Sequence, residues 1–326
     1  MSNLSKILKS SKIEIIREIF SKNKIDTLIV FPYQKIAYYL IKDKERNKDD
    51  VRFWIISDRE IKDVNDIIKN KVKVGVYLND LYHAQIKQIR KKFRIIDISK
   101  EIDKKREVKT KDEIENIKKA CKINERVYEK IISKRIFDIN ETDLAKEIEK
   151  GIIDYNARAA FPTIVSYGKN TSSIHHIPKK YIAKDIVMID FGSQFNGYCS
   201  DITITIPRKN IYREVFEDVY YTLGILEDYA KEGMDVQELK KIAEDCLRKY
   251  KKGIFSRYHM LGHGVGIEIH ESPNFNENEI LKKNMIVALE PAVYFKGKFG
   301  IRLESTYLIR KEKKARNLCS IIEKIL

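Results

Sequence analysis

The chain has 326 residues, of which 43% are hydrophobic and 34% charged, and these values are typical of a globular protein with two domains. Its formal net charge is +16, but the lysines are spread along the whole chain without interleaved aromatic residues, so a basic surface is expected rather than a nucleic-acid site. No apolar run reaches the roughly 18 residues of a membrane-spanning helix, which excludes an integral membrane protein.

Residues 1–106 are predicted to form a small α/β domain. Helices are expected over about 5–21, 59–70 and 80–93. They alternate with strands in "DTLIVF", "VRFWIIS", "KVKVGVYL" and "RIIDIS". Such alternation favours a mostly parallel or mixed sheet. The domain has no glycine-rich phosphate loop, so nothing in it indicates a nucleotide site.

A charged segment, "KEIDKKREVKTKDE", is predicted to link this domain to a second one over residues 107–326. At its end Thr110 and Glu113 form a T-x-x-E capping box, which indicates the start of a long helix. A second helix is expected to follow and to include Leu144–Ile152. Its cap is predicted to be Thr142 or Asn140.

The rest of the second domain is predicted to be strand-rich. Strands are expected in "FPTIVSYG", "IVMIDFG" and "YCSDITITI". Two helices over about 211–231 and 236–250 follow, the second capped by Asp235. Strands return in "GVGIEIH", "MIVALEPAVYF" and "GIRLESTYLI". The predicted fold class is therefore α+β, with helices clustered around an antiparallel sheet and the smaller α/β domain preceding it.

Two of these apolar strands contain a carboxylate where an apolar residue would be expected. Asp190 follows four apolar residues in "IVMIDFG", and Glu290 follows five in "MIVALEPAVYF". An unpaired ionised carboxylate in an apolar site costs several kcal/mol, so such a group usually neutralises, pairs or binds a metal.

The first hairpin places a second carboxylate beside Asp190. A turn at Asn196-Gly197 is a strong hairpin signal. If the loop is centred near 195–196, Asp190 lies opposite Asp201. If Asn-Gly is itself a two-residue turn, Asp190 lies opposite Thr203, and Asp201 is its diagonal neighbour. Both registers put the two carboxylates on one face.

The second hairpin repeats this arrangement. The loop "FKGKFG" is centred near Gly297, which sets Glu290 roughly opposite Glu304. Like charges that face each other on a sheet are destabilising unless something positive lies between them. The two pairs together indicate one or two bound cations.

His263 is the histidine that joins this set most readily. It lies in "GHGVG", where glycines on both sides let a backbone and a metal approach closely. Four carboxylates and one imidazole suit Mn²⁺ or Co²⁺, with Fe²⁺ or Zn²⁺ as alternatives, better than they suit a thiolate-type zinc site. Two divalent ions would balance the four carboxylates. At about 3.5–4 Å apart they would hold a bridging hydroxide as a nucleophile.

The four cysteines, Cys121, Cys199, Cys246 and Cys319, lie far apart in the sequence. They form no C-x-x-C pair, so neither a disulfide framework nor a zinc knuckle is indicated. The first 20 residues lack the unbroken apolar core of a signal peptide. A cytoplasmic location is expected. Cys199 is interpreted as a buried thiol rather than a sixth ligand.

Four motifs together resemble the pita-bread metallopeptidases, the M24-type family that includes methionine aminopeptidase, Xaa-Pro aminopeptidase and prolidase. They are "MIDFGSQFNGYCSDITIT", "GHGVGIEIHESP", "LEPAVY" and "GIRLES". The resemblance covers most of residues 107–326. "GYCSDIT", "EPAVY" and the preceding α/β domain resemble the Xaa-Pro branch more closely than methionine aminopeptidase.

The resemblance implies a role for each of the five metal-binding candidates. Asp190 would bind one metal ion, Asp201 and Glu304 would bridge both ions, and His263 and Glu290 would bind the other. Glu290 would also move the proton of the bridging water.

Further residues are implied to act on the substrate. His270 would donate a hydrogen bond to the oxyanion of the tetrahedral intermediate. His175 resembles the substrate-side histidine that precedes the first aspartate strand, with His176 as its rival. The resemblance also places three residues in the substrate pocket: His259, Tyr294 and Arg302.

The sequence therefore predicts a dinuclear metallo-exopeptidase that hydrolyses Xaa-Pro bonds, in dipeptides or at peptide N-termini, through the bridging hydroxide. Methionine aminopeptidase activity is the enzymatic alternative. A non-catalytic binding module on the same fold is the other alternative, although such a protein would be expected to have lost metal ligands. Peptides are the expected substrates, and a homodimer is expected by analogy with the family.

Overall fold

The structure is a computed structural model of the chain. It describes residues 27–30, 36–42, 51–57, 73–76, 83–91, 94–132, 136–250 and 259–324. The chain divides into two compact units, Met1–Arg106 and Glu107–Leu326. The helices predicted over 5–21 and 59–70 lie outside the described residues.

The first unit contains a five-stranded sheet in the order β3-β2-β1-β4-β5. Its strands are β1 (Thr27–Val30), β2 (Ile36–Lys42), β3 (Val51–Ser57), β4 (Lys73–Val76) and β5 (Arg94–Asp97). β1, β2 and β3 pair antiparallel, whereas β1, β4 and β5 pair parallel, so the prediction of a mixed sheet is confirmed. Helix α4 (His83–Arg90) precedes β5, as predicted, whereas β2 was not predicted.

The charged segment predicted to be a linker spans the boundary between the two units, and its residues 100–107 are helical, which was not predicted. Helix α5 (Ser99–Glu107) begins where Asp97 accepts hydrogen bonds from the backbone N–H and the hydroxyl of Ser99 (2.9 and 2.6 Å). Lysine, glutamate and arginine are good helix formers. Glu101 in the first turn and Arg106 in the last turn also complement the helix dipole.

The long helix α6 (Lys111–Ile132) starts with the predicted capping box. The backbone N–H of Thr110 donates to the Glu113 carboxylate at 2.7 Å, and the N–H of Glu113 donates to the Thr110 hydroxyl at 3.3 Å. These two bonds satisfy two of the N–H groups that the first turn of a helix leaves unpaired.

Three further helices of the second unit are α7 (Glu141–Asp154), α8 (Arg213–Tyr229) and α9 (Val236–Cys246). Asn140 caps α7 by accepting from the N–H of Asp143, which decides between the two predicted caps. Asp235 caps α9 as predicted, by accepting from the N–H of Gln237 at 2.8 Å.

The strands of the second unit form four small sheets in the orders β11-β8-β7, β13-β12-β14-β17-β18, β15-β16 and β10-β9-β6. Their bounds are β6 (Arg158–Ala159), β7 (Ile164–Tyr167), β8 (Ile186–Phe191), β9 (Ser193–Phe195), β10 (Tyr198–Cys199), β11 (Ile202–Pro207), β12 (Gly262–Gly264), β13 (Glu271–Asn274), β14 (Ile286–Leu289), β15 (Ala292–Phe295), β16 (Phe299–Arg302), β17 (Ser305–Leu308) and β18 (Arg316–Asn317).

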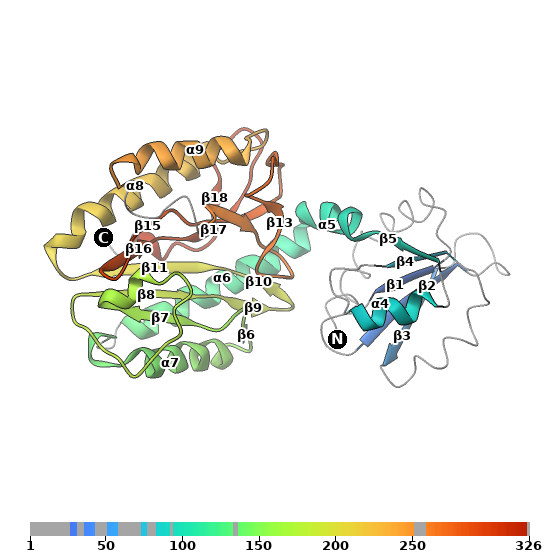
Figure 1. The fold of residues 1–326 in the computed structure, drawn as a ribbon, viewed down its shortest axis with the longest axis horizontal. Helices are drawn as coiled ribbons and strands as arrows, with labels where there is room; N and C mark the ends of the chain where they lie inside the picture. Colours follow the sequence, from blue (N-terminus) through green and yellow to red (C-terminus); the bar gives the residue numbers. More distant parts are fainter. Residues whose placement is uncertain are drawn as a thin grey trace. The chain divides into compact units, whose positions relative to one another are not determined.

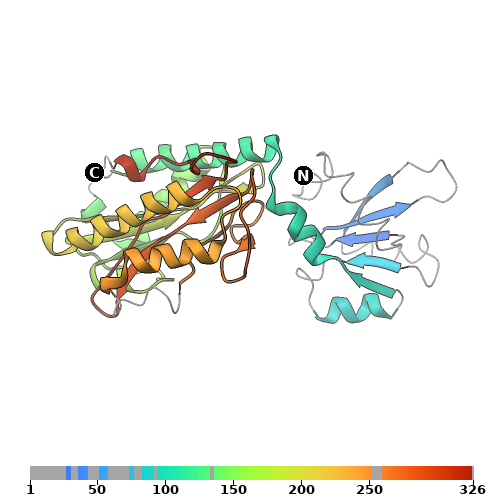
Figure 2. The same cartoon turned by 90° about the horizontal axis from the view of Figure 1, so that it is seen from above.

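Helices cover the strands of this unit on two sides. In Figure 1, α6 and α7 lie along β7, β8 and β11, and α8 and α9 lie along β14 to β17. The view from above in Figure 2 looks onto α8 (yellow) and α9 (orange), which lie in front of the strands. Each pair closes a hydrophobic core against its own strands. The strands between the two cores are therefore deeply buried, and every residue of β8 is buried.

The strand predicted over "GVGIEIH" is wrong. The strand β12 ends at Gly264, and the chain folds back into β13 only at Glu271. The carboxylate of Glu271 accepts from the backbone N–H groups of Ile267 and Glu268 (3.0 and 3.4 Å), which gives these groups a partner outside any ladder. A Cβ at Gly264 would lie 2.2 Å from the carbonyl oxygen of Ser272, so this tight return requires glycine.

Candidate metal centre

The first hairpin adopts the second of its two predicted registers. Asn196 and Gly197 both have positive φ angles (52° and 83°), which is typical of a two-residue hairpin turn. Asp190 consequently pairs with Thr203, and Asp201 is its diagonal neighbour on the same face.

The second hairpin also confirms the predicted pairing. Leu289 pairs with Ser305 and Ala292 with Arg302, so Glu290 and Glu304 lie opposite each other between these pairs. Pro291 follows Glu290 and has no N–H to donate, so the ladder is interrupted there.

At this interruption the two glutamates bond to other segments. The N–H of Glu290 donates to Leu261 (2.9 Å), and that of Glu304 donates to Thr203 (2.9 Å). Glu290 is therefore held by the residue just before β12, the strand that carries His263, and Glu304 is held by β11, which directly follows Asp201.

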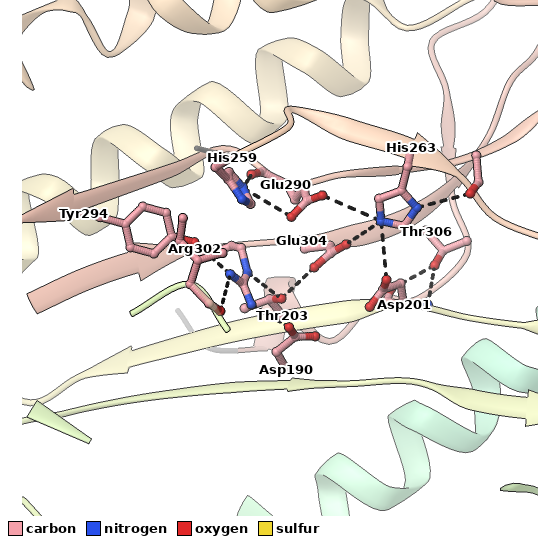
Figure 3. A network of polar contacts seen from close by, with 12 residues as sticks. Asp190, Asp201, Thr203, His259, His263, Glu290, Tyr294, Arg302, Glu304 and Thr306 are labelled. Carbon is pink, nitrogen blue, oxygen red and sulfur yellow. Dashed lines mark hydrogen bonds and ion pairs between the residues drawn. The ribbon is translucent and has the colours of Figure 1, made fainter. Parts of the chain in front are cut away.

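All five predicted metal ligands come together between the two hairpins (Figure 3). Ligand atoms lie within 4.8 Å of one another in three groups of residues: Asp190, Asp201 and Glu304; His263, Glu290 and Glu304; and Asp201, His263 and His270. All five predicted ligands are buried, whereas His270 is exposed. Glu304 belongs to the first two groups, as expected for a residue between two ions.

The imidazole of His263 presents a lone pair to the carboxylates. Its Nδ1 donates to the carbonyl oxygen of Gly264 at 3.1 Å, which leaves Nε2 as the acceptor in the neutral ring. Nε2 lies 3.5 Å from Asp201, 3.6 Å from Glu290 and 3.7 Å from Glu304. These separations exceed a hydrogen bond. They suit ligands of a common ion, each about 2.0–2.2 Å from it.

The buried carboxylates cannot all ionise without added positive charge. Burial raises the pKa of Asp201 and Glu290 well above the ordinary carboxyl value, and the charge of Glu304 raises both further. Burial also raises the pKa of Asp190, and the positive charge of Arg302 offsets only part of this effect. For Glu304, burial is outweighed by His263 and Arg302, and its pKa is lowered.

Two oxygen atoms point to what the centre holds. Asp190 Oδ1 and Asp201 Oδ1 are buried and have no hydrogen-bond partner among the described residues. Buried carboxylate oxygens are almost always satisfied by a donor or a cation. Free oxygens, mutual repulsion and a suitably oriented imidazole together fit divalent metal ions.

The comparisons with known proteins agree with this geometry. Residues 115–311 match the family model "Metallopeptidase family M24". The chain belongs to metallopeptidase family M24. A Xaa-Pro dipeptidase of Pyrococcus furiosus is 31% identical over 81% of this chain and 79% of its own length. A putative Xaa-Pro aminopeptidase of Mycoplasma genitalium is 34% identical over 73% of this chain and 69% of its own length.

The solved prolidase from Pyrococcus furiosus superposes with a TM-score of 0.80 at 25% identity, covering 93% of this chain and 98% of that one. The predicted resemblance and the α+β pita-bread fold are thus confirmed. No helix among the described residues has both the length and the apolar character needed to cross a membrane.

In this M24 metallopeptidase, Arg302 is buried beside the metal centre. Its guanidinium bonds to Asp190 at 2.5 Å, to the hydroxyl of Tyr294 at 2.7 Å and to the hydroxyl of Thr203 at 3.0 Å. The Thr203 hydroxyl in turn donates to Glu304 at 2.6 Å. Arg302 therefore supplies the positive charge that the first group of carboxylates receives from the protein itself.

His259 and Tyr294, predicted to line the pocket, lie on the Glu290 side of the centre. Their rings contact edge to face with centroids 5.6 Å apart. His259 Nε2 is 2.9 Å from the backbone oxygen of Glu290 and 3.2 Å from its carboxylate. Burial, followed by the charge of Arg302, lowers the pKa of His259 to about 3, so its ring is neutral at neutral pH.

The two candidate substrate-side histidines face different surroundings. His176 is buried, and its Nε2 contacts Glu141 at 2.7 Å. His175 is exposed, and its charge contributes, after the larger effect of burial, to the lowered pKa of both His259 and His270. His176 is thus committed to Glu141, whereas His175 stays the candidate for the substrate-side histidine.

Glu141 fastens the loop that carries His175. Besides His176, its carboxylate accepts from the backbone N–H of Tyr167 (2.9 Å), the amide of Asn170 (2.8 Å) and the N–H of Lys179 (2.9 Å). Four donors on one fully buried carboxylate hold both ends of residues 167–179 against the start of α7. This role was not predicted, since in the sequence Glu141 is only the residue after a helix cap.

His270 lies in the loop between β12 and β13, with its ring edge to face against His263 at 4.2 Å between centroids. Glu271 braces this loop through Ile267 and Glu268, and it pairs with the buried Lys109 at 2.8 Å. Cys199 is buried, donates to Ile267 O at 3.3 Å and has its pKa raised to about 12 by burial, so it stays a thiol.

Proposed function

We propose that this M24 metallopeptidase is a dinuclear exopeptidase that hydrolyses Xaa-Pro bonds, in dipeptides or at peptide N-termini. The observation that carries the proposal is the pair of overlapping ligand groups that share Glu304. The named relatives are Xaa-Pro dipeptidases and aminopeptidases, which supports the substrate class. All five ligand candidates are present, which argues against a non-catalytic module.

The proposed assignment gives Asp190 to one ion, His263 and Glu290 to the other, and Asp201 and Glu304 to both. Mn²⁺ or Co²⁺ suits a set of mainly carboxylate oxygens with one imidazole. When bound, two such ions lower the pKa of water and polarise a carbonyl oxygen.

The remaining chemistry falls to side chains around the ions. Glu290 lies between His259 and His263 and is proposed to take the proton of the attacking water. His270, exposed beside His263, is proposed to donate a hydrogen bond to the developing oxyanion. His175, His259, Tyr294 and Arg302 are proposed to border the substrate.

Metal dependence is the first test. The purified protein should lose peptide hydrolysis after thorough chelation and should regain it when Mn²⁺ or Co²⁺ is added, with two ions bound per chain by elemental analysis. Hydrolysis that survives complete removal of metal would contradict the proposal.

The substrate class is tested with three peptides in parallel. Ala-Pro represents dipeptides, Arg-Pro-Pro represents longer peptides with proline in second position, and Met-Ala represents methionine aminopeptidase substrates. Turnover of the first two and not the third is expected. Preference for Met-Ala would establish the alternative.

We also propose a cytoplasmic homodimer. The free cysteines fit a reducing compartment, and dimerisation is proposed by analogy with the family. Light scattering coupled to size-exclusion chromatography should give twice the chain mass of 38.4 kDa.

A further inference from the structure

Two strand segments, residues 201–205 and 302–306, face each other across the metal centre. They meet directly at a single bridge, where Thr203 N–H donates to Glu304 O (3.3 Å) and Glu304 N–H donates to Thr203 O (2.9 Å). In a regular antiparallel ladder, the pairs two residues away on either side would exchange backbone bonds in the same way. At both of these positions a threonine hydroxyl lies between the backbones instead.

On one side of the bridge the hydroxyl belongs to Thr306. Its Oγ1 accepts from the N–H of Asp201 at 3.0 Å and donates to the carbonyl oxygen of Asp201 at 2.8 Å. Figure 3 shows Thr306 beside Asp201, with Glu304 and His263 close by. One hydroxyl thus holds both backbone groups of a proposed bridging ligand.

On the other side the arrangement is reversed. Thr205 of the first hairpin accepts from the N–H of Arg302 at 3.1 Å and donates to its carbonyl oxygen at 2.7 Å. Arg302 is the partner of Asp190. Each hairpin therefore contributes one threonine that bonds the backbone of a residue of the centre on the opposite hairpin.

These contacts leave little freedom in the spacing of the hairpins. A hydroxyl has one hydrogen and two lone pairs, so one donation and one acceptance fit its capacity. Thr205 and Thr306 are both fully buried, with 0% of their surface exposed. If either hydroxyl were lost, the backbone groups it satisfies would have to find each other by moving the strands together, or remain unpaired.

We propose that Thr205 and Thr306 are positioning residues that set the separation of the two hairpins, and through it the spacing of Asp201 and Glu304 at the metal ions. The hydroxyls act as fixed spacers on either side of the Thr203–Glu304 bridge. This inference rests on the metal ligands assigned under the proposed function.

The test compares valine and serine at both positions. Valine keeps the branched shape of threonine but lacks the hydroxyl, whereas serine keeps the hydroxyl and loses only a methyl group. Thr222→Val is the control, because Thr222 is equally buried but its hydroxyl donates to Asp218 O of its own helix (2.6 Å) and lies beside the thiol of Cys246, and neither partner belongs to the metal centre. Metal-free samples are titrated with Co²⁺, following the visible absorption spectrum and the heat of binding, and folding is followed by circular dichroism.

The Thr306→Val and Thr205→Val proteins should bind Co²⁺ at least about tenfold more weakly, with an altered absorption spectrum, which is the scale of loss for residues that orient metal ligands. Thr306→Ser, Thr205→Ser and Thr222→Val should keep the wild-type affinity and spectrum. Wild-type affinity and spectrum in both valine variants would overturn the inference. Valine variants that fail to fold while the serine variants fold would also overturn it, since the hydroxyls would then serve the fold alone.

The wild-type titration separates this inference from the proposed function. If the wild-type protein takes up fewer than two Co²⁺ ions, the dinuclear proposal fails. If it takes up two ions, any difference among the variants reports on the threonines.

Discussion

The two halves of the metal centre have the same arrangement of elements, but they differ in how far protein contacts satisfy their carboxylates. Each half is a histidine-bearing loop followed by a hairpin with two carboxylates. The first half, residues 168–207, carries His175, and the second half, residues 259–308, carries His270. Each loop is braced by one glutamate: Glu141 of α7 braces the loop of the first half, and Glu271, directly after His270, braces that of the second.

The halves differ in what satisfies their carboxylates. In the first half, Asp190 and Asp201 each keep a buried oxygen without a partner. In the second half, Glu304 accepts from Thr203, and neither glutamate keeps a buried oxygen without a partner among the described residues. The carboxylates of the second half are therefore satisfied largely by protein contacts, whereas those of the first half need cations to complete their contacts.

The largest effect is expected from Asp201→Asn. Asparagine keeps the size of aspartate but removes the charge from a buried group that contacts both halves. We expect both metal loading and Xaa-Pro hydrolysis to fall below detection, measured by elemental analysis and peptide turnover. Asp143→Asn, the same change at an exposed position on α7, should leave both intact. An Asp201→Asn protein that still binds two ions would remove this aspartate from the ligand set.

His270→Ala changes only the loop of the second half and should have a smaller effect. If His270 donates to the oxyanion, kcat should fall by about a hundredfold or more, as for the loss of one oxyanion donor. Metal content should stay at the wild-type level, because the five ligands are unchanged. Loss of metal in step with activity would show instead that His270 supports His263.

Glu141→Gln tests the loop of the first half and should have the smallest effect. Glutamine replaces one acceptor oxygen by an NH₂ group, which cannot accept from the four donors around it. We expect KM to rise about tenfold, the scale of one hydrogen bond to a charged group, with little change in kcat.

The control for this variant is Glu149→Gln on the same helix, where the carboxylate makes a single long contact of 3.4 Å to the N–H of Thr163. It should change neither constant. If both variants showed the same changes in kcat and KM, the effect would come from α7 as a whole and not from the Glu141 contacts.

Much of the centre could be predicted because its signals are local. The Asn196-Gly197 turn fixes the register that places Asp190 beside Asp201, and Glu290 and Glu304 are set by one short loop. Helix caps such as Asn140 also depend on residues a few positions away.

The features that escaped prediction depend on distant partners or on competing local bonds. Thr306 bonds a residue 105 positions away and Thr205 one 97 positions away, and nothing in the sequence near either threonine indicates the pairing. The segment after Gly264 has the apolar alternation of a strand. Two of its N–H groups, however, donate to the Glu271 carboxylate and not to a neighbouring strand. The charged run after Asp97 has the composition of a linker, yet a local cap starts a helix there.

Because Glu304 belongs to both ligand groups, the two proposed ion positions are thermodynamically linked. A second cation would have to share the charge of this carboxylate with the first, and the two cations would repel each other. The second ion should therefore bind more weakly than the first. Uptake should therefore be stepwise, with a half-loaded species that has its own composition and reactivity. The amount of free metal in the surroundings would then set which species the protein presents to a peptide.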